Sequence, residues 1–217
     1  MKKAVIFDLD GTLLNTLPDI AAAMNRALAH HGLPTHPERA YRLFTGNGAR
    51  ILTQRALGEG RTADMEEQVY HRYAEDYAAN SLVDTAPYPD IPQMLRALTE
   101  HGIQVCVFSN KDDTDVQPVV RHFFADQQLA VVRGARPGVA LKPDPAAPLA
   151  IAASLGLTPA DFMYVGDTQT DMRCAKNAGM DSVAVTWGFQ TREEIAPGQP
   201  GQYADSAEEL LAILLRA

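Results

Sequence analysis

The sequence predicts an α/β fold: a doubly wound, Rossmann-like parallel sheet with an all-helical domain inserted after the first strand. Short apolar runs rich in β-branched residues alternate with helical patterns, which is typical of a parallel sheet covered on both faces. Residues 15–82 break this alternation with helical patterns alone, over a stretch too long for a crossover connection. We therefore predict a core domain of residues 1–14 and 83–217 and a helical domain of residues 15–82.

The elements follow from these patterns in chain order. Strands are expected at residues 4–7, 103–108, 162–165 and 182–186, with a weaker one at 129–132. Core helices are expected at residues 91–101, 113–124, 145–155, 170–178 and 207–216, and inserted helices at residues 17–31, 37–44, 49–57 and 63–80. Gly102, Gly156 and Gly179 follow three of the core helices, where a left-handed backbone often ends a helix. The inserted domain is expected to form a lid, because both of its connections leave the sheet near the end of the first strand.

Bulk composition excludes several classes of protein. The formal net charge of −8 over 217 residues argues against a nucleic-acid groove or an anionic membrane surface as the main partner. No apolar run approaches the roughly 20 residues that cross a bilayer, and Asp8 and Asp10 interrupt the apolar stretch where a secretory signal would continue. Cys106 and Cys174 fall in an apolar strand and a helix, as buried thiols of a reducing compartment do. We expect a cytoplasmic protein.

Polar residues follow the predicted strands at the points where the strands end. They are Asp8 and Asp10 after the first strand, Ser109 and Asn110 after the second, Asp167 and Asp171 after a later one, and Lys142 before a core helix. Ligands of an open parallel sheet bind outside the carboxyl ends of its strands, so these side chains are expected to converge. Asp8 and Asp10 start out on the same side of their strand, and two like charges at one place require a positive partner.

The chemistry of this set indicates a metal and a phosphate. Carboxylates without histidine or thiolate suit a hard cation such as Mg²⁺, which usually also binds substrate phosphate. Lys142 supplies a second positive charge, and the turn at Gly11 and Thr12 can present backbone N–H groups to phosphate oxygens. The site is therefore predicted to attract a dianion even though the chain is acidic.

Four short motifs occur in order at these positions: DLDGT at 8–12, FSN at 108–110, KPDP at 142–145 and GDTQTD at 166–171. With them, nearly the whole chain resembles the haloacid-dehalogenase-like hydrolase superfamily, and the inserted helices resemble its helical cap. The segments TGNGA at 45–49 and SNK at 109–111 are similar to phosphoglycolate phosphatases. The sequence departs from many relatives at residues 14–16, where LNT stands in place of a segment with Asp-Ser.

The resemblance implies a covalent mechanism. Asp8 attacks phosphorus to form an aspartyl-phosphate, and Asp10 protonates the leaving alkoxide and then activates the water that hydrolyses the intermediate. Mg²⁺ is held by Asp8, by the backbone carbonyl of Asp10 and by Asp167. Asp171 either supports the metal or orients Lys142, and the sequence does not distinguish between these two roles.

The resemblance also implies roles in binding. The phosphoryl group is expected to contact Thr12, Ser109, Asn110 and Lys142. In the Gly-rich turn of the inserted domain, Asn47 and Arg50 are candidate specificity residues, although an ordinary turn between helices explains that segment nearly as well.

These features predict a Mg²⁺-dependent phosphatase that hydrolyses a small phosphorylated metabolite, with phosphoglycolate as the first substrate to test. Dehalogenases that resemble this fold lack the second acid, because a departing halide needs no proton, so Asp10 favours phosphoryl transfer. The enzyme alternatives are a sugar-phosphate or pyrophosphate hydrolase and a phosphomutase. The alternative outside enzymes is a phosphorylation-dependent signalling or binding module, although receiver domains are shorter and lack such a helical insertion.

Overall fold

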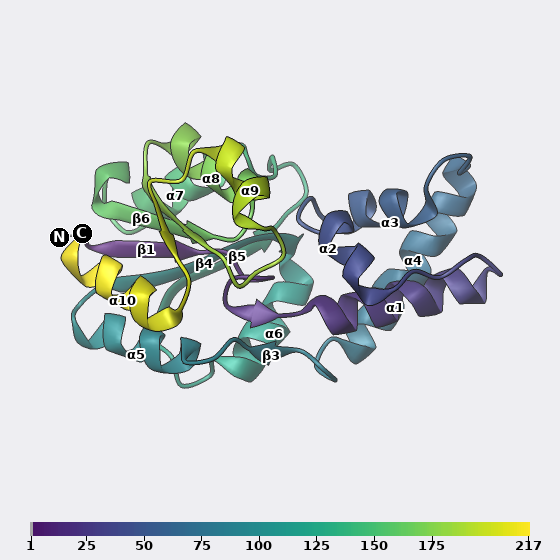
Figure 1. Ribbon diagram of the computed structural model, residues 1–217, viewed down its shortest axis with the longest axis horizontal. Coiled ribbons are helices and arrows are strands. Elements are labelled where there is room, and N and C mark those ends of the chain that lie inside the picture. The colour runs from purple at the N-terminus through teal and green to yellow at the C-terminus, as the bar shows by residue number, and fades with distance from the viewer. Residues whose placement is uncertain (1) are drawn as a thin grey trace.

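The computed structural model describes residues 2–217, and its centre is a six-stranded parallel sheet between two layers of helices (Figure 1). The strands are β1 (Ala4–Phe7), β4 (Gln104–Asp112), β5 (Leu129–Ala135), β6 (Phe162–Gly166), β7 (Asp181–Val185) and β8 (Gln202–Ala204). Their order is β5-β4-β1-β6-β7-β8, so the chain winds outward from β1 in both directions. The predicted doubly wound α/β fold is confirmed, and its switch point lies at the carboxyl end of β1, beside Asp8.

Alternate residues of β1 enter two separate apolar clusters, one on each face of the sheet. Val5 and Phe7 pack in the cluster that contains the buried sides of α5 (Ile91–Glu100), α6 (Asp113–Phe123) and α10 (Ala207–Arg216). Ala4 and Ile6 pack in the cluster that contains α7 (Ala146–Ser154) and α8 (Gln169–Ala178). A strand buried on both faces needs apolar side chains at every position, which explains the unbroken apolar run at the start of the chain.

The inserted helices have an apolar cluster of their own and lie beyond the carboxyl end of β1 (Figure 1). They are α1 (Leu17–His30), α2 (Tyr41–Phe44), α3 (Ala49–Leu57) and α4 (Ala63–Asn80), with a 3₁₀ turn at Glu38–Ala40. Phe189, which follows β7, packs into this cluster from the sheet side. We refer to these helices as the helical block; the division of the chain into domains at residues 15–82 stays a prediction.

The two connections to the helical block run side by side. β2 (Leu14–Asn15) and β3 (Ala86–Pro87) pair antiparallel. In the first turn of α1, the buried carboxylate of Asp19 accepts hydrogen bonds from the backbone N–H groups of residues 83–85, at 2.9 to 3.1 Å. The chain is therefore fastened where it leaves the sheet and where it returns, next to the end of β1.

Several elements differ from the sequence-based expectation. β4 continues past residue 108 to Asp112, with an irregular register against β5 after Phe108. The helix expected at 37–44 is a 3₁₀ turn followed by the short α2. β8 was not expected, because three residues are too few to display an apolar pattern. The remaining short helices are α9 (Arg192–Ile195) and the 3₁₀ turns Pro159–Asp161 and Ala196–Gly198. Within residues 2–217, every helix is too short or too polar to cross a bilayer.

Candidate active site

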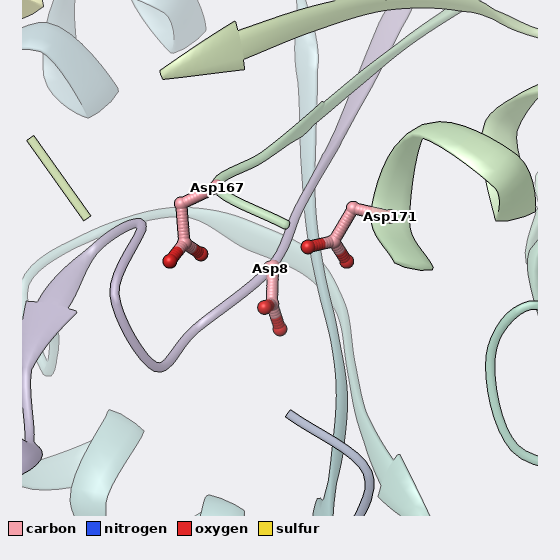
Figure 2. A group of neighbouring side chains, drawn as sticks. All are labelled: Asp8, Asp167 and Asp171. Carbon is pink, nitrogen blue, oxygen red and sulfur yellow. The ribbon is translucent and has the colours of Figure 1, made fainter. Parts of the chain in front are cut away.

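Three carboxylates meet at the carboxyl ends of β1 and β6. Asp8 follows β1, Asp167 follows β6, and Asp171 lies in the first turn of α8. Figure 2 shows the three side chains gathered in one place, and one oxygen of each lies within 4.8 Å of the others. All three are buried, and Asp167 is fully so. The structure thus brings together residues 163 positions apart, as the strand-end argument predicted.

Glycines make room for these carboxylates. A Cβ atom on Gly11 would lie 2.3 Å from Oδ2 of Asp167, and one on Gly188 would lie 2.3 Å from its Cβ. A Cβ on Gly166 would lie 2.4 Å from the Cβ of Asp171. The side chains of Asp167 and Asp171 therefore pack directly against the backbone of these glycines. A larger residue at any of these positions would displace a carboxylate.

Lys142 lies between two of the three carboxylates. Its Nζ is 2.8 Å from Oδ1 of Asp8 and 2.9 Å from Oδ1 of Asp171. Burial lowers the pKa of Lys142, but the carboxylates of Asp171 and Asp8 outweigh burial, and the pKa lies well above its usual value. The ammonium is therefore charged. Asp171 does orient Lys142, and it also belongs to the carboxylate group, so the two roles left open for it are compatible in this geometry.

One ammonium does not balance three buried carboxylates. Burial raises the pKa of Asp8 to about 7, partly offset by Lys142 and increased by Asp171. Burial, with Asp8 and Asp171 as like charges, raises the pKa of Asp167 well above its usual value. Oxygen-only donors with excess negative charge, packed against glycine, fit a hard divalent cation such as Mg²⁺. Asp8, Asp167 and Asp171 are the side chains that could hold it.

Asp8 and Asp167 are held by further hydrogen bonds. The backbone N–H of Leu9 donates to Oδ1 of Asp8 at 2.7 Å, so both protein contacts of this carboxylate use Oδ1. Asp167 accepts from the Thr12 hydroxyl at 2.8 Å and from the backbone N–H of Phe189 at 2.7 Å. Oδ2 of Asp8 is thereby left without a hydrogen bond to any residue in 2–217, at the centre of the site.

Asp10 pairs with a second lysine, Lys111. Lys111 was not identified from the sequence as a site residue. Nζ of Lys111 lies 2.5 Å from Oδ1 of Asp10 and donates to the Tyr77 hydroxyl at 2.7 Å. Lys111 follows the Ser-Asn pair on β4, and Tyr77 comes from α4 of the helical block. The SNK segment was a signal that could have identified Lys111, but its contact with Asp10 depends on the extension of β4.

The predicted phosphate-binding residues take different positions. Ser109 is buried beside the site, and its Oγ accepts from the backbone N–H of Lys111 at 3.1 Å, which leaves its hydroxyl hydrogen free. Asn110 accepts from the backbone N–H of Lys142 at 2.9 Å and donates to the carbonyl of Gly46 at 3.1 Å. The hydroxyl of Thr12 is used by Asp167. Asn110 and Thr12 thus make structural contacts here, and their roles in phosphate binding stay predictions.

A cavity lies between the strand ends and the helical block. From the sheet it is lined by Asp8, Asp10, Ser109, Asn110, Lys111 and Lys142, and from the helical block by Ile20, Leu52, Tyr73 and residues 45, 46, 48 and 49. Asn47 and Arg50 do not line it. Asn47 accepts from Arg55 at 2.8 Å, and Arg50 pairs with Glu67 at 2.6 Å. Their role in specificity stays a prediction.

A parallel sheet with a buried carboxylate group and two buried lysines at its switch point is the arrangement of an α/β enzyme that binds its ligand at the strand ends. The family model of haloacid dehalogenase-like hydrolases matches residues 5–185, and the chain belongs to this family.

Comparisons with individual proteins agree with this membership. The chain is 35% identical to a phosphoglycolate phosphatase of Mannheimia succiniciproducens and 35% identical to one of Haemophilus influenzae, and each match covers 98% of both chains. It is also similar to the crystal structure of a predicted phosphoglycolate phosphatase from Haemophilus somnus, with a TM-score of 0.92, 32% identity and 98% of both chains covered. The structure of CbbY from Rhodobacter sphaeroides shares the fold, with a TM-score of 0.82 at 23% identity over 97% of this chain and 96% of that one.

Proposed function

We propose that the protein is a Mg²⁺-dependent phosphoric monoester hydrolase that acts on a small phosphorylated metabolite, with phosphoglycolate as the first substrate to test. The observation that carries this proposal is the buried group of Asp8, Asp167 and Asp171 next to a cavity, with Lys142 paired to Asp8 and Asp171. Similarity over 98% of the chain to phosphoglycolate phosphatases of two bacteria supports the same reaction and suggests the same substrate.

In the first half-reaction, Oδ2 of Asp8 attacks phosphorus, and the bond from phosphorus to the ester oxygen breaks. Asp10 gives its proton to the departing oxygen, which leaves as an alcohol. Lys142 and the free hydroxyl of Ser109 stabilise the charge on the transferring phosphoryl group. Asp8 is then an aspartyl-phosphate.

In the second half-reaction, Asp10 takes a proton from a water molecule that attacks the same phosphorus atom. The bond between phosphorus and Asp8 breaks, so inorganic phosphate leaves and the carboxylate of Asp8 is restored. Asp10 is again protonated for the next turnover. The contact of Asp10 with Lys111 holds the carboxyl group at the side of the cavity where both proton transfers are required.

Mg²⁺, when bound, would neutralise charge on the phosphoryl oxygens and on the carboxylates that surround it. Asp8 and Asp167 would be its side-chain ligands, with the backbone carbonyl of Asp10, and Asp171 would support the set. The fit of this ion rests on the donors being oxygen atoms only and on their excess negative charge.

We place the reaction in the cytoplasm. Cys106 and Cys174 are both buried and unpaired, as in proteins of a reducing compartment. The negative net charge suits a small-molecule substrate drawn in locally by buried lysines, and it does not suit nucleic acid as a partner.

The test is release of phosphate from a panel of phosphorylated metabolites and from p-nitrophenyl phosphate, with Mg²⁺ and with EDTA. We expect steady release of phosphate over many turnovers that requires Mg²⁺, with phosphoglycolate among the best substrates. A phosphomutase would release phosphate from monoesters only slowly, because it protects its aspartyl-phosphate from water. No Mg²⁺-dependent release from any monoester would overturn the proposal.

A further inference from the structure

The wall of the cavity next to Asp10 contains hydrogen-bond donors that have no partner. The ammonium of Lys111 has three N–H groups, and the structure uses two of them, for Asp10 at 2.5 Å and for the Tyr77 hydroxyl at 2.7 Å. The Lys111 side chain is 8% exposed, and its Nζ lies 4.8 Å from the centre of the Tyr77 ring. Lys111 is therefore a fixed, buried cation with one donor left, on the wall of the cavity.

Tyr73 supplies a second unused donor, beside the Tyr77 ring that Lys111 also contacts. It comes from α4, lines the cavity, and is 4% exposed. Its ring stacks on that of Tyr77 with 5.6 Å between the centres, which fixes its direction. Its hydroxyl makes no hydrogen bond within residues 2–217 and is not among the fully buried unpaired side-chain atoms of these residues, so it is accessible from the cavity. Burial raises the pKa of Tyr73 well above its usual value, so the hydroxyl keeps its proton and can donate.

We propose that Lys111 and Tyr73 form a subsite that binds a carboxylate on the leaving group of the substrate. The inference rests on the proposed function, because it takes Asp10 as the acid that meets the ester oxygen. In phosphoglycolate a single methylene separates the ester oxygen from the carboxylate, so the carboxylate lies about 3–4 Å beyond the atom that Asp10 protonates. The ammonium of Lys111 lies 2.5 Å from Oδ1 of Asp10, so it is close enough to pair with such a carboxylate.

The same wall limits what the leaving group can be. Asp112 and Asp115 also line the cavity, and neither side chain makes a hydrogen bond with another residue in 2–217. Asp112 is exposed and Asp115 half-buried, so they lie toward solvent while Lys111 lies deeper. An anionic group that extended past Lys111 would meet these two carboxylates. The subsite therefore suits a short phosphorylated acid and disfavours a second phosphate on a longer chain.

The experiment compares phosphoglycolate with ethyl phosphate, which has a methyl group in place of the carboxylate. The measured quantity is the ratio of the two kcat/KM values, with enough enzyme to turn over the poorer substrate. We expect Tyr73→Phe and Lys111→Met each to lower this ratio at least about tenfold, because a site that hydrogen-bonds a substrate group discriminates strongly in its favour. Tyr70→Phe, on the same helix but away from the cavity wall, is the matched control and leaves the ratio unchanged.

An unchanged ratio in Tyr73→Phe overturns the subsite. For Lys111→Met, a proportional loss with both substrates overturns the role of Lys111 in recognition, because it would mean that Lys111 acts only by holding Asp10. Tyr73 makes no hydrogen bond with Asp10, so its variant separates recognition of the leaving group from the positioning of the acid. Turnover of p-nitrophenyl phosphate by the unmodified enzyme distinguishes failure of the subsite from failure of the proposed function, since that substrate has no carboxylate.

Discussion

The ammonium of Lys142 lies 2.8 Å from the carboxylate of Asp8, although Asp8 follows the central strand β1 and Lys142 lies between the edge strand β5 and α7. The same ammonium contacts Asp171, so a single buried cation joins β1 to the start of α8. Buried charges of this kind are costly unless they are paired, and removal of one partner leaves the others uncompensated. The ion pairs of Lys142 with Asp8 and Asp171 should therefore affect both the stability of the fold and the reaction at Asp8.

We expect Lys142→Met to destabilise the Mg²⁺-free protein by about 3–5 kcal/mol and to abolish most activity, because two buried carboxylates lose their cation. Chemical denaturation in EDTA measures the free energy of unfolding. Lys176→Met is the control, since within residues 2–217 that lysine bonds only the exposed Gln199, and its cost should stay within about 0.5 kcal/mol. An equal cost for the two variants would contradict the role of Lys142.

Gly11→Ala should weaken Mg²⁺ activation strongly, because the new Cβ would displace the Asp167 carboxylate, 2.3 Å away. Gly11 has a φ of +86°, so part of the loss in stability would be backbone strain. Gly32→Ala carries a comparable strain, at a φ of +68°, but its Cβ meets nothing within 4 Å. The Mg²⁺ concentration for half-maximal activity should rise about tenfold or more in the first variant and stay unchanged in the second. A similar rise in this concentration in both variants would show that backbone strain, and not displacement of Asp167, causes the effect.

Stability of the Mg²⁺-free protein should fall as the pH rises from about 5 to about 7. Burial raises the pKa of Asp8 from 3.8 to about 7, and Asp167 is shifted in the same direction, so the folded protein binds more protons than the unfolded chain in this window. The free energy of unfolding should therefore decrease, by on the order of 1 kcal/mol per pH unit. Urea denaturation measures this slope. Mg²⁺ should flatten this pH dependence, and so should Asp8→Asn. A slope that Mg²⁺ does not change would contradict the assignment of Asp8 and Asp167 to the metal site.

Asp10→Asn should slow hydrolysis of alkyl phosphates by about 10²–10⁴-fold, the usual contribution of a positioned acid or base. The loss in formation of the aspartyl-phosphate should be smaller for p-nitrophenyl phosphate, because its leaving group is stable without a proton. Burst and steady-state rates of the variant measure the two steps separately. Equal losses in the burst with both kinds of ester would argue against proton donation by Asp10, and loss of folding would indicate a structural role.

Much of the site could be predicted because its main residues follow strands. Asp8, Asp167 and Lys142 are local features of the sequence, and the geometry of a parallel sheet alone requires strand ends to lie at one edge. The alternation of strands and helices fixed the order of elements in the same way. For these three residues, the part that required the coordinates is the orientation of Lys142 between Asp8 and Asp171.

The residues around Asp10 could not be predicted, because their positions depend on how separate elements pack. Lys111 reaches Asp10 only because β4 extends to Asp112, and an irregular strand end leaves no periodic signal. Tyr73 and Tyr77 reach the cavity because α4 packs over it, and that depends on the docking of the helical block. The Gly-rich turn made Asn47 a candidate specificity residue. Its neighbours Gly46 and Gly48 line the cavity, but Asn47 does not.

The central claim is that Asp8 carries the phosphoryl group during turnover, and acid quenching followed by borohydride reduction tests it most directly. Reduction converts an acyl phosphate of aspartate to homoserine, which peptide mass spectrometry locates. The account predicts homoserine at position 8 when substrate and Mg²⁺ are present, and none there without substrate. Sustained phosphate release with no modification at position 8, or with the modification at another carboxylate, would contradict it.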